Sequence, residues 1–360
     1  MKRLRAGELV EVRSKEEILA TLDRNGRLEG LPFMPQMFAY CGKQFKVYKR
    51  AHKTCDFVYT ASSRWLRDGI HLDLRCDGAA YGGCQHDCLL WWKEAWLKRV
   101  EDVGGRASAL PVSPFPVRAR AMCSEADVLA GTTSVNQQGE SIFTCQATEV
   151  LDFTTPLPWW DLRQYVEDYT SGNVAMSRLA SGFIYGLFSA VKNSGLKIGR
   201  PMRWGYDVLA ATFGFSRYPR RPGLVPDGQK TPTIALNLRP GELVRVKSYE
   251  EILATLDADC NNRGLYFDAE LVPYCGKVFR VKSVVNTFLD EKTRKLRKVK
   301  SPCIILEGAF CQGKFSHCRM LCPRSILSWW HEIWLERVPE SALAPQRATD
   351  AKQVSVGAQL

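Results

Sequence analysis

The chain contains an internal duplication, and this limits what it can fold into. Residues 7–23, GELVEVRSKEEILATLD, recur as residues 241–257, GELVRVKSYEEILATLD, with 14 of the 17 positions identical. Self-similarity of this length predicts one supersecondary unit used twice. Two further matches are YCGKQFKV at 40–47 with YCGKVFRV at 274–281, and WWKEAWLKRV at 91–100 with WWHEIWLERV at 329–338.

The repeat divides the chain into four parts. A length of 360 residues is enough for two or three domains with cores of their own. We expect a first cysteine-rich copy at 1–100, a partly helical central segment and linker at 101–240, and a second copy at 241–338. The polar tail at 339–360 is predicted to be disordered.

Each copy has the pattern of an α+β module. Residues 9–12 alternate as a strand, and Ser14 with Glu17 three residues later predicts a capped helix reaching Leu22. Strands are also predicted over 45–48 and 70–74. Residues 89–100 have amphipathic helical spacing, so we expect a helix that covers the sheet and buries its tryptophans.

The central segment is predicted to be mainly helical. Helices are expected over 162–169, with Asp161 as N-cap, and over 174–193 and 206–211, followed by a strand over 231–239. The longest apolar run, 179–191, has thirteen residues, whereas a membrane-spanning helix needs about 20. A buried helix is therefore expected, with a helix in the membrane interface as the alternative and no transmembrane segment.

The strand Gly-Glu-Leu-Val-x-Val, the long loop after it and the strand Tyr-Cys-Gly-Lys-x-Phe-x-Val resemble SH3-like small barrels. The resemblance implies two SH3-like β-barrel modules, each with a covering helix, flanking the helical centre. The whole arrangement also resembles a group of uncharacterised bacterial proteins with duplicated cysteine-rich modules. Neither resemblance implies an activity, because a fold does not assign a function.

Thirteen cysteines are the main chemical signal. The N-terminus has no apolar stretch of the kind found in secretory signals, so a cytoplasmic location is expected. Cytoplasmic thiols stay reduced, which leaves metal ligation, redox chemistry or burial as their roles. The glycine-rich stretch from Cys76 to Cys84 offers little to pack, so we expect a bound metal to order it.

Three cysteine positions are common to both copies, and a fourth is available in each. Four thiolates suit zinc or an iron–sulfur cluster. The close pairs have three residues between them rather than the two of a zinc knuckle, which places the cluster slightly ahead of zinc. The shared positions are Cys41 with Cys275, Cys76 with Cys311, and Cys84 with Cys322, and the fourth ligand is Cys88 or Cys55 in copy one and Cys318 or Cys303 in copy two.

Other residues could join or replace these ligands. His86 and His317 stand beside cysteines and could each substitute for a thiolate. His52 and His331 are expected to be solvated. In the centre, Cys123 and Cys145 are interpreted as extra ligands or as a resolving pair.

The favoured hypothesis is a thiolate metal-binding protein with a redox or accessory role, including that of an enzyme in a specialised biosynthetic pathway. No Gly-rich phosphate loop, dinucleotide fingerprint or nucleophile elbow is present. The alternative is a nucleic-acid-binding protein with tandem small barrels and structural zinc. A net charge of +12 and the basic run at 292–300 support that alternative. A small-molecule or protein partner is otherwise unspecified.

Overall fold

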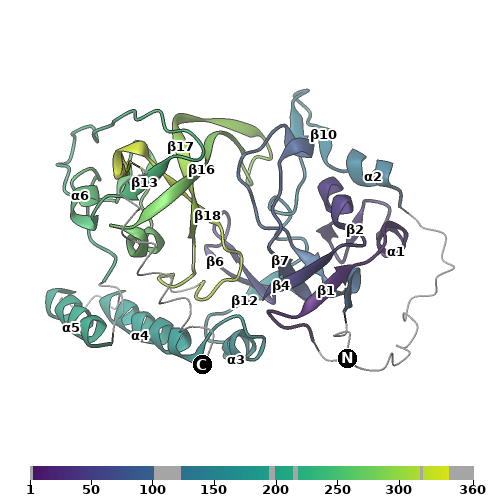
Figure 1. The fold of residues 1–360 in the computed structure, drawn as a ribbon, viewed down its shortest axis with the longest axis horizontal. Helices are drawn as coiled ribbons and strands as arrows, with labels where there is room; N and C mark the ends of the chain where they lie inside the picture. The colour runs from purple at the N-terminus through teal and green to yellow at the C-terminus, as the bar shows by residue number, and fades with distance from the viewer. Residues whose placement is uncertain (1–2, 101–122, 194–198, 214–217, 317–318, 340–360) are drawn as a thin grey trace. The chain divides into compact units, whose positions relative to one another are not determined.

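The structure, a computed structural model, describes residues 3–100, 123–193, 199–213, 218–316 and 319–339. These residues form a mixed α+β fold of small antiparallel sheets with few helices, which confirms the predicted class (Figure 1). The predicted tail, apart from Pro339, lies outside them. The chain divides into two units: unit 1 is Met1–Arg217, Thr287–Val299 and Cys311–Ile326, and unit 2 is Tyr218–Asn286, Lys300–Phe310 and Leu327–Leu360.

A five-stranded sheet in unit 1 has the order β8-β7-β4-β1-β9, and every neighbouring pair is antiparallel. The strand predicted at 9–12 is confirmed as β1, and that at 45–48 lies within β4. The core against this sheet is apolar and rich in aromatic rings. The strands are β1 (Leu9–Val12), β4 (Gln44–Arg50), β7 (Gly69–Leu72), β8 (Trp92–Lys93) and β9 (Leu97–Arg99).

Smaller elements complete the strands of unit 1. A three-stranded sheet has the order β12-β6-β5, and two short hairpins, β2-β3 and β10-β11, stand apart from it. The bounds are β2 (Arg27–Leu28), β3 (Leu31–Pro32), β5 (Lys53–Asp56), β6 (Ser62–Trp65), β10 (Thr133–Val135), β11 (Ser141–Phe143), β12 (Thr155–Leu157) and the 3-10 helices η1 (Pro35–Tyr40), η2 (Ala79–Tyr81) and η3 (Glu94–Trp96).

The helix predicted over 89–100 is wrong. The segment is extended on either side of the single turn η3: Trp92 pairs with Ile70 in β7, and Leu97 pairs with Val12 in β1. A short apolar run is compatible with a buried strand as well as with a helix. Here the segment pairs with β7 before the turn and with β1 after it, so it is extended. The expected burial of the tryptophans is confirmed, since Trp96 is 0% exposed.

The capped helix predicted after residue 14 is confirmed but short. In α1 (Lys15–Leu19) the Ser14 hydroxyl accepts from Glu17 N–H at 3.2 Å, and the Glu17 carboxylate accepts from Ser14 N–H at 3.0 Å. This reciprocal capping satisfies two otherwise unpaired donors. The same pattern, Ser248 with Glu251, begins α6 (Tyr249–Leu253) in unit 2.

The central helices are also confirmed in outline. The helix α3 begins after Leu162, one residue later than expected, and the Asp161 carboxylate still accepts from the Arg163 N–H at its start at 3.1 Å. The apolar run at 179–191 lies in α4, which buries Leu179 but leaves Leu187 exposed. Within the described residues, no helix has the length and apolar character to cross a membrane. The helices are α2 (Glu125–Ala130), α3 (Arg163–Thr170), α4 (Met176–Asn193) and α5 (Gly199–Phe213).

The second five-stranded sheet has the order β18-β17-β16-β13-β19. Val244 pairs with Phe279 as Val10 pairs with Phe45, so both partners are shifted by the same 234 positions. Both sheets are open, and no closed SH3-like barrel is found in the described residues. The elements are β13 (Leu243–Val246), β14 (Asn261–Asn262), β15 (Leu265–Tyr266), β16 (Val278–Leu289), β17 (Leu296–Phe310), β18 (Leu327–Trp330), β19 (Leu335–Arg337), η4 (Ala269–Tyr274) and η5 (Glu332–Trp334).

The strand predicted over 231–239 is wrong. Its backbone N–H groups bond to a side chain instead of to a neighbouring strand: the Glu332 carboxylate accepts from Leu236 at 2.6 Å and from Leu238 at 2.8 Å. A carboxylate that binds successive N–H groups replaces the sheet ladder there.

Candidate functional site

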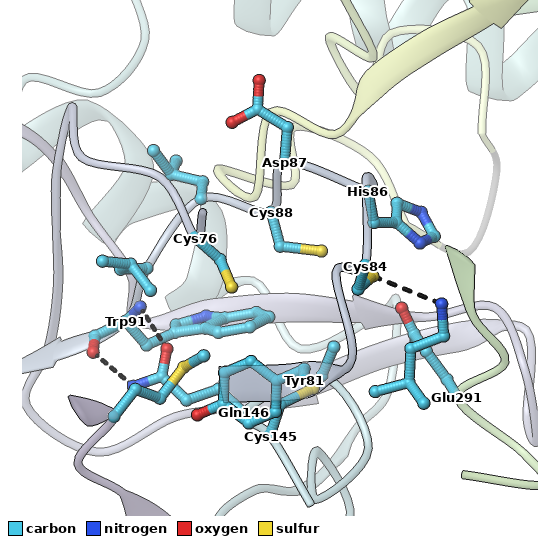
Figure 2. A pocket seen from close by; sticks show the side chains of 15 residues that line it. Cys76, Tyr81, Cys84, His86, Asp87, Cys88, Trp91, Cys145, Gln146 and Glu291 are labelled. Atoms are coloured by element: carbon cyan, nitrogen blue, oxygen red, sulfur yellow. Dashed lines mark hydrogen bonds between the residues drawn. The ribbon is translucent and has the colours of Figure 1, made fainter. Parts of the chain in front are cut away.

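One small cavity in unit 1 brings four cysteines together (Figure 2). Cys76, Cys84 and Cys88 reach it from the loop after β7, and Cys145 reaches it from the central segment. We call this space the cysteine cavity. The space open to water inside it is about 30 Å³, room for only a few water-sized occupants. Most of the other lining residues are apolar, and the polar ones are His86, Asp87, Gln146 and Glu291.

Main-chain hydrogen bonds and glycine fold the loop 76–88 around the cavity. The Cys76 N–H donates to the Cys88 carbonyl at 2.8 Å and closes the loop. Gly78 has a φ of 72°, and a Cβ at this position would lie 1.9 Å from the Cys84 carbonyl oxygen, so only glycine fits. The expectation that this loop has little to pack is wrong, because Tyr81 is 1% exposed and anchors it in the core.

Gln146 holds the central segment against the cavity wall. Its side-chain amide accepts from Trp91 N–H at 2.9 Å and donates to the Trp91 and Pro32 carbonyls, each at 2.9 Å. The amide thus pairs with Trp91 as a neighbouring strand would, and it fixes the position of Cys145 next to it. Sequence analysis missed Gln146, since a single glutamine gives no periodic or spacing signal.

Two of the sulfur atoms accept hydrogen bonds. The Gln36 side-chain amide donates to Cys76 Sγ at 3.2 Å. The Leu289 N–H donates to Cys84 Sγ at 3.2 Å, and Figure 2 marks this bond. Both sulfurs are therefore held in one orientation in this structure.

Burial keeps the cavity groups uncharged. It raises the pKa of Cys76 and of Cys145 to about 12, and it also raises the pKa of Cys84 and Cys88. Burial likewise lowers the pKa of His86 to about 4. At neutral pH the cavity holds protonated thiols and a neutral imidazole. Such thiols are weak nucleophiles, and they ligate a metal only by releasing their protons.

A buried ion pair borders the cavity. Glu291 lines it and pairs with Arg324 at 2.9 Å, and neither side chain is more than a tenth exposed. The Arg324 guanidinium also lies 5.0 Å from the Trp91 ring. Its positive charge opposes the effect of burial on the pKa of Cys88 and so favours the thiolate there.

The four sulfurs line the cavity but do not converge. In the part of the chain that the structure describes, no three His, Cys, Asp or Glu side chains surround one point closely enough to hold a metal ion. A bound ion would therefore need the cysteine side chains to turn about their Cα–Cβ bonds. Each cysteine has only that one torsion to adjust before its sulfur is placed.

The other predicted ligands lie outside the cysteine cavity. Cys55 and Cys322 are neighbours in unit 1 and each shifts the pKa of the other, and Cys311 lies near Cys322. Cys318 and His317 lie outside the described residues. The remaining cysteines are Cys41 after η1, Cys123 before α2, Cys260 before β14, Cys275 after η4 and Cys303 on β17.

The expectation that His52 and His331 are solvated is wrong. His52 is 1% exposed, and its Nε2 lies 3.2 Å from the Gln164 carbonyl. The Nε2 of His331 lies 3.0 Å from the Asn262 carbonyl. Each imidazole has a main-chain oxygen to bond inside the core, which compensates for its loss of water.

The basic run at 292–300 is largely paired with acidic side chains. Arg294 lies 2.8 Å from Glu149, and Arg297 lies 2.6 Å from Asp290. Lys295 pairs with Glu140. Three of the six cations in the run are engaged in these ion pairs, which reduces the charge that the run offers to phosphates.

Comparison with known proteins gives no relative for this arrangement. No protein-family model, curated protein or solved structure matches the chain.

Proposed function

We propose that this protein binds a single divalent metal ion, zinc foremost, through Cys76, Cys84, Cys88 and Cys145. The observation that carries the proposal is that these four side chains, from two distant parts of the chain, line one cavity. A thiolate tetrad is the usual ligand set of closed structural zinc sites. The role we infer is accessory: the ion would tie the central segment to the loop 76–88.

The size of the cavity favours one ion over a cluster. A water-accessible volume of about 30 Å³ admits no more than a few water-sized occupants. An iron–sulfur cluster brings several iron and sulfide atoms and would need a larger space. This reverses the order of preference that cysteine spacing alone gave.

The test is metal content after anaerobic purification. We expect close to one zinc per chain and no visible colour. Cys88→Ser and Cys145→Ser should lose the metal, because each removes a cavity thiol. Cys123→Ser is the matched control, since it removes a central cysteine that does not line the cavity, and it should keep the metal. Metal-free wild-type protein, or full zinc content in Cys145→Ser, would contradict the proposal, and iron with sulfide would point to a cluster.

The raised thiol pKa values also predict a steep pH dependence of metal affinity. Four thiols that are protonated at neutral pH release about four protons on ligation, so the logarithm of the affinity should fall by about four per pH unit lost. Competition titrations between pH 6 and 8 with a zinc chelator measure this slope. A slope near zero would mean that the thiols are not the ligands.

A further inference from the structure

The segment 320–324 lies against strand β5 at a constant offset. The Lys53 ammonium donates to the Met320 carbonyl at 2.9 Å. Four residues further along each segment, the Arg324 guanidinium lies 5.1 Å from the Phe57 ring. Both pairs are 267 positions apart. The same offset places Cys322 opposite Cys55, midway between these contacts.

The two thiols meet at this midpoint. Cys55 and Cys322 lie close enough for each to shift the pKa of the other, and neither is in a disulfide. They are 5% and 6% exposed. Arg324 also connects the two segments, because its guanidinium donates to the Cys55 carbonyl at 3.2 Å. The contact is therefore held by groups on both sides of it.

The two sulfurs differ in acidity. The neighbouring Cys322 and burial both raise the pKa of Cys55. Burial raises the pKa of Cys322 too, but the neighbouring Cys55 and a hydrogen bond from the Arg324 N–H outweigh it, and the pKa falls below its usual value. Cys322 is thus the better nucleophile of the two.

A second place in unit 1 brings the corresponding positions together without the second thiol. Leu289 corresponds to Cys55 at the repeat offset of 234, and Cys84 corresponds to Cys322 at an offset of 238, since each lies seven residues before the first Trp of its Trp-Trp pair. There the Leu289 N–H donates to Cys84 Sγ at 3.2 Å. The close approach is common to both places, whereas the paired thiols occur only at Cys55 and Cys322.

We propose that Cys55 and Cys322 are a redox pair that closes to a disulfide when a hydroperoxide oxidises the protein. The Cys322 sulfur attacks one peroxide oxygen, the O–O bond breaks, and one water leaves with the thiol proton. The resulting sulfenic acid is attacked by the Cys55 sulfur; the S–S bond forms, the S–O bond breaks, and a second water leaves. With hydrogen peroxide, two thiols lose two electrons and two protons, and the peroxide becomes two waters. Two equivalents of a small thiol reduce the disulfide by exchange and leave as their own disulfide.

The test is disulfide mapping of the full-length native protein after brief treatment with hydrogen peroxide and alkylation of the remaining thiols. We expect a peptide linking Cys55 to Cys322, and a faster band on a non-reducing denaturing gel because the link closes a long loop. Both should disappear in Cys55→Ser and in Cys322→Ser. Cys303→Ser, which removes a buried thiol of unit 2, should keep both.

A variant that gains a disulfide complements the variants that lose one. Leu289→Cys places a thiol beside Cys84, which the proposed function makes a metal ligand, so after removal of metal with a chelator the oxidised variant should contain a second linked peptide, joining position 289 to Cys84, in addition to the first. Absence of the Cys55–Cys322 peptide from native protein, or survival of the fast band in Cys55→Ser, would overturn the proposal. So would a link that forms only in denaturant.

Discussion

A buried ion pair at β5 is the residue-scale feature with the largest expected effect on stability. Lys53 and Asp168 are both 0% exposed, and their charged atoms lie 2.6 Å apart. The ammonium also donates to the Gln164 side chain at 3.3 Å and to the Met320 carbonyl at 2.9 Å. Each charge is compensated only as long as the other is present.

Removing one partner should therefore cost far more than removing both. We expect Lys53→Met to lower the free energy of unfolding by about 3–5 kcal/mol, because it leaves the Asp168 carboxylate buried without its ammonium partner and with only His52 beside it. The double variant Lys53→Met with Asp168→Leu should recover most of this loss. Denaturant unfolding of the wild type, both single variants and the double variant measures the coupling. Additive losses would show that the pair does not act as a unit.

At this scale the sequence predicts residue types better than it predicts their neighbours. It singled out Cys76, Cys84 and Cys88 from their crowding in one glycine-rich loop, and it offered Cys145 as an extra ligand. It could not separate Cys41 from this group, because a shared repeat position says nothing about which side chains meet. Lys53 gave no signal at all, since its partner Asp168 is 115 positions away.

At the scale of elements, the repeat supplies a matched pair of glycines in different surroundings. Gly30 and Gly264 occupy equivalent turns, with φ of 81° and 84°. A Cβ on Gly30 would lie 2.7 Å from the Asp152 carbonyl oxygen, whereas a Cβ on Gly264 would meet nothing within 4 Å. The local backbone is therefore the same, and only the packing differs.

Alanine substitutions at these turns should separate backbone strain from packing. Gly264→Ala should cost about 1–2 kcal/mol for the left-handed backbone alone. Gly30→Ala carries the same strain and also a clash that requires backbone movement, so we expect about 1–3 kcal/mol more. Denaturant unfolding of the two variants compares them. Equal losses would mean that the contact at Asp152 relaxes freely.

Elements with a local signal are the ones that the sequence predicts. The capping residues Ser14 and Glu17 determine α1, and alternation determines β1. The helix predicted over 89–100 was wrong because the apolar residues of this segment fit the period of a strand as well as that of a helix. Only the pairing with β7 and β1 shows that the segment is extended. The segment 231–239 was misread because its hydrogen-bond acceptor, Glu332, is distant in sequence.

At the scale of the molecule, the two units differ in how far apart in the chain the segments that form them lie. Unit 2 is contained within 218–360, whereas unit 1 needs 287–299 and 311–326 in addition to the first 217 residues. These later segments provide Leu289 to the core of unit 1, and the Met320 carbonyl to Lys53. Boundaries drawn from the repeat assign these segments to the second copy, because such boundaries depend on position in the sequence and not on contacts in space.

Fragments of the chain should therefore behave unequally. We expect 218–360 to unfold cooperatively on its own, since its core cluster is complete. The fragment 1–240 should lack a cooperative transition, because it leaves Lys53 and the core without their later partners. Circular dichroism during thermal unfolding, with the full chain as reference, distinguishes them. A sharp transition in 1–240 would show that the later segments are dispensable.

The contacts of Leu289 with Cys84 and of Cys55 with Cys322 are two versions of one contact between the copies. In each, the outer part of one copy's hairpin meets the cysteine loop of the other copy. Two separate single-copy chains that exchanged hairpins would make the same pair of contacts, as a domain-swapped homodimer does. Symmetry would force the two interfaces of such a dimer to be identical. A fused chain is free of that constraint, and here one interface has two thiols while the other has one.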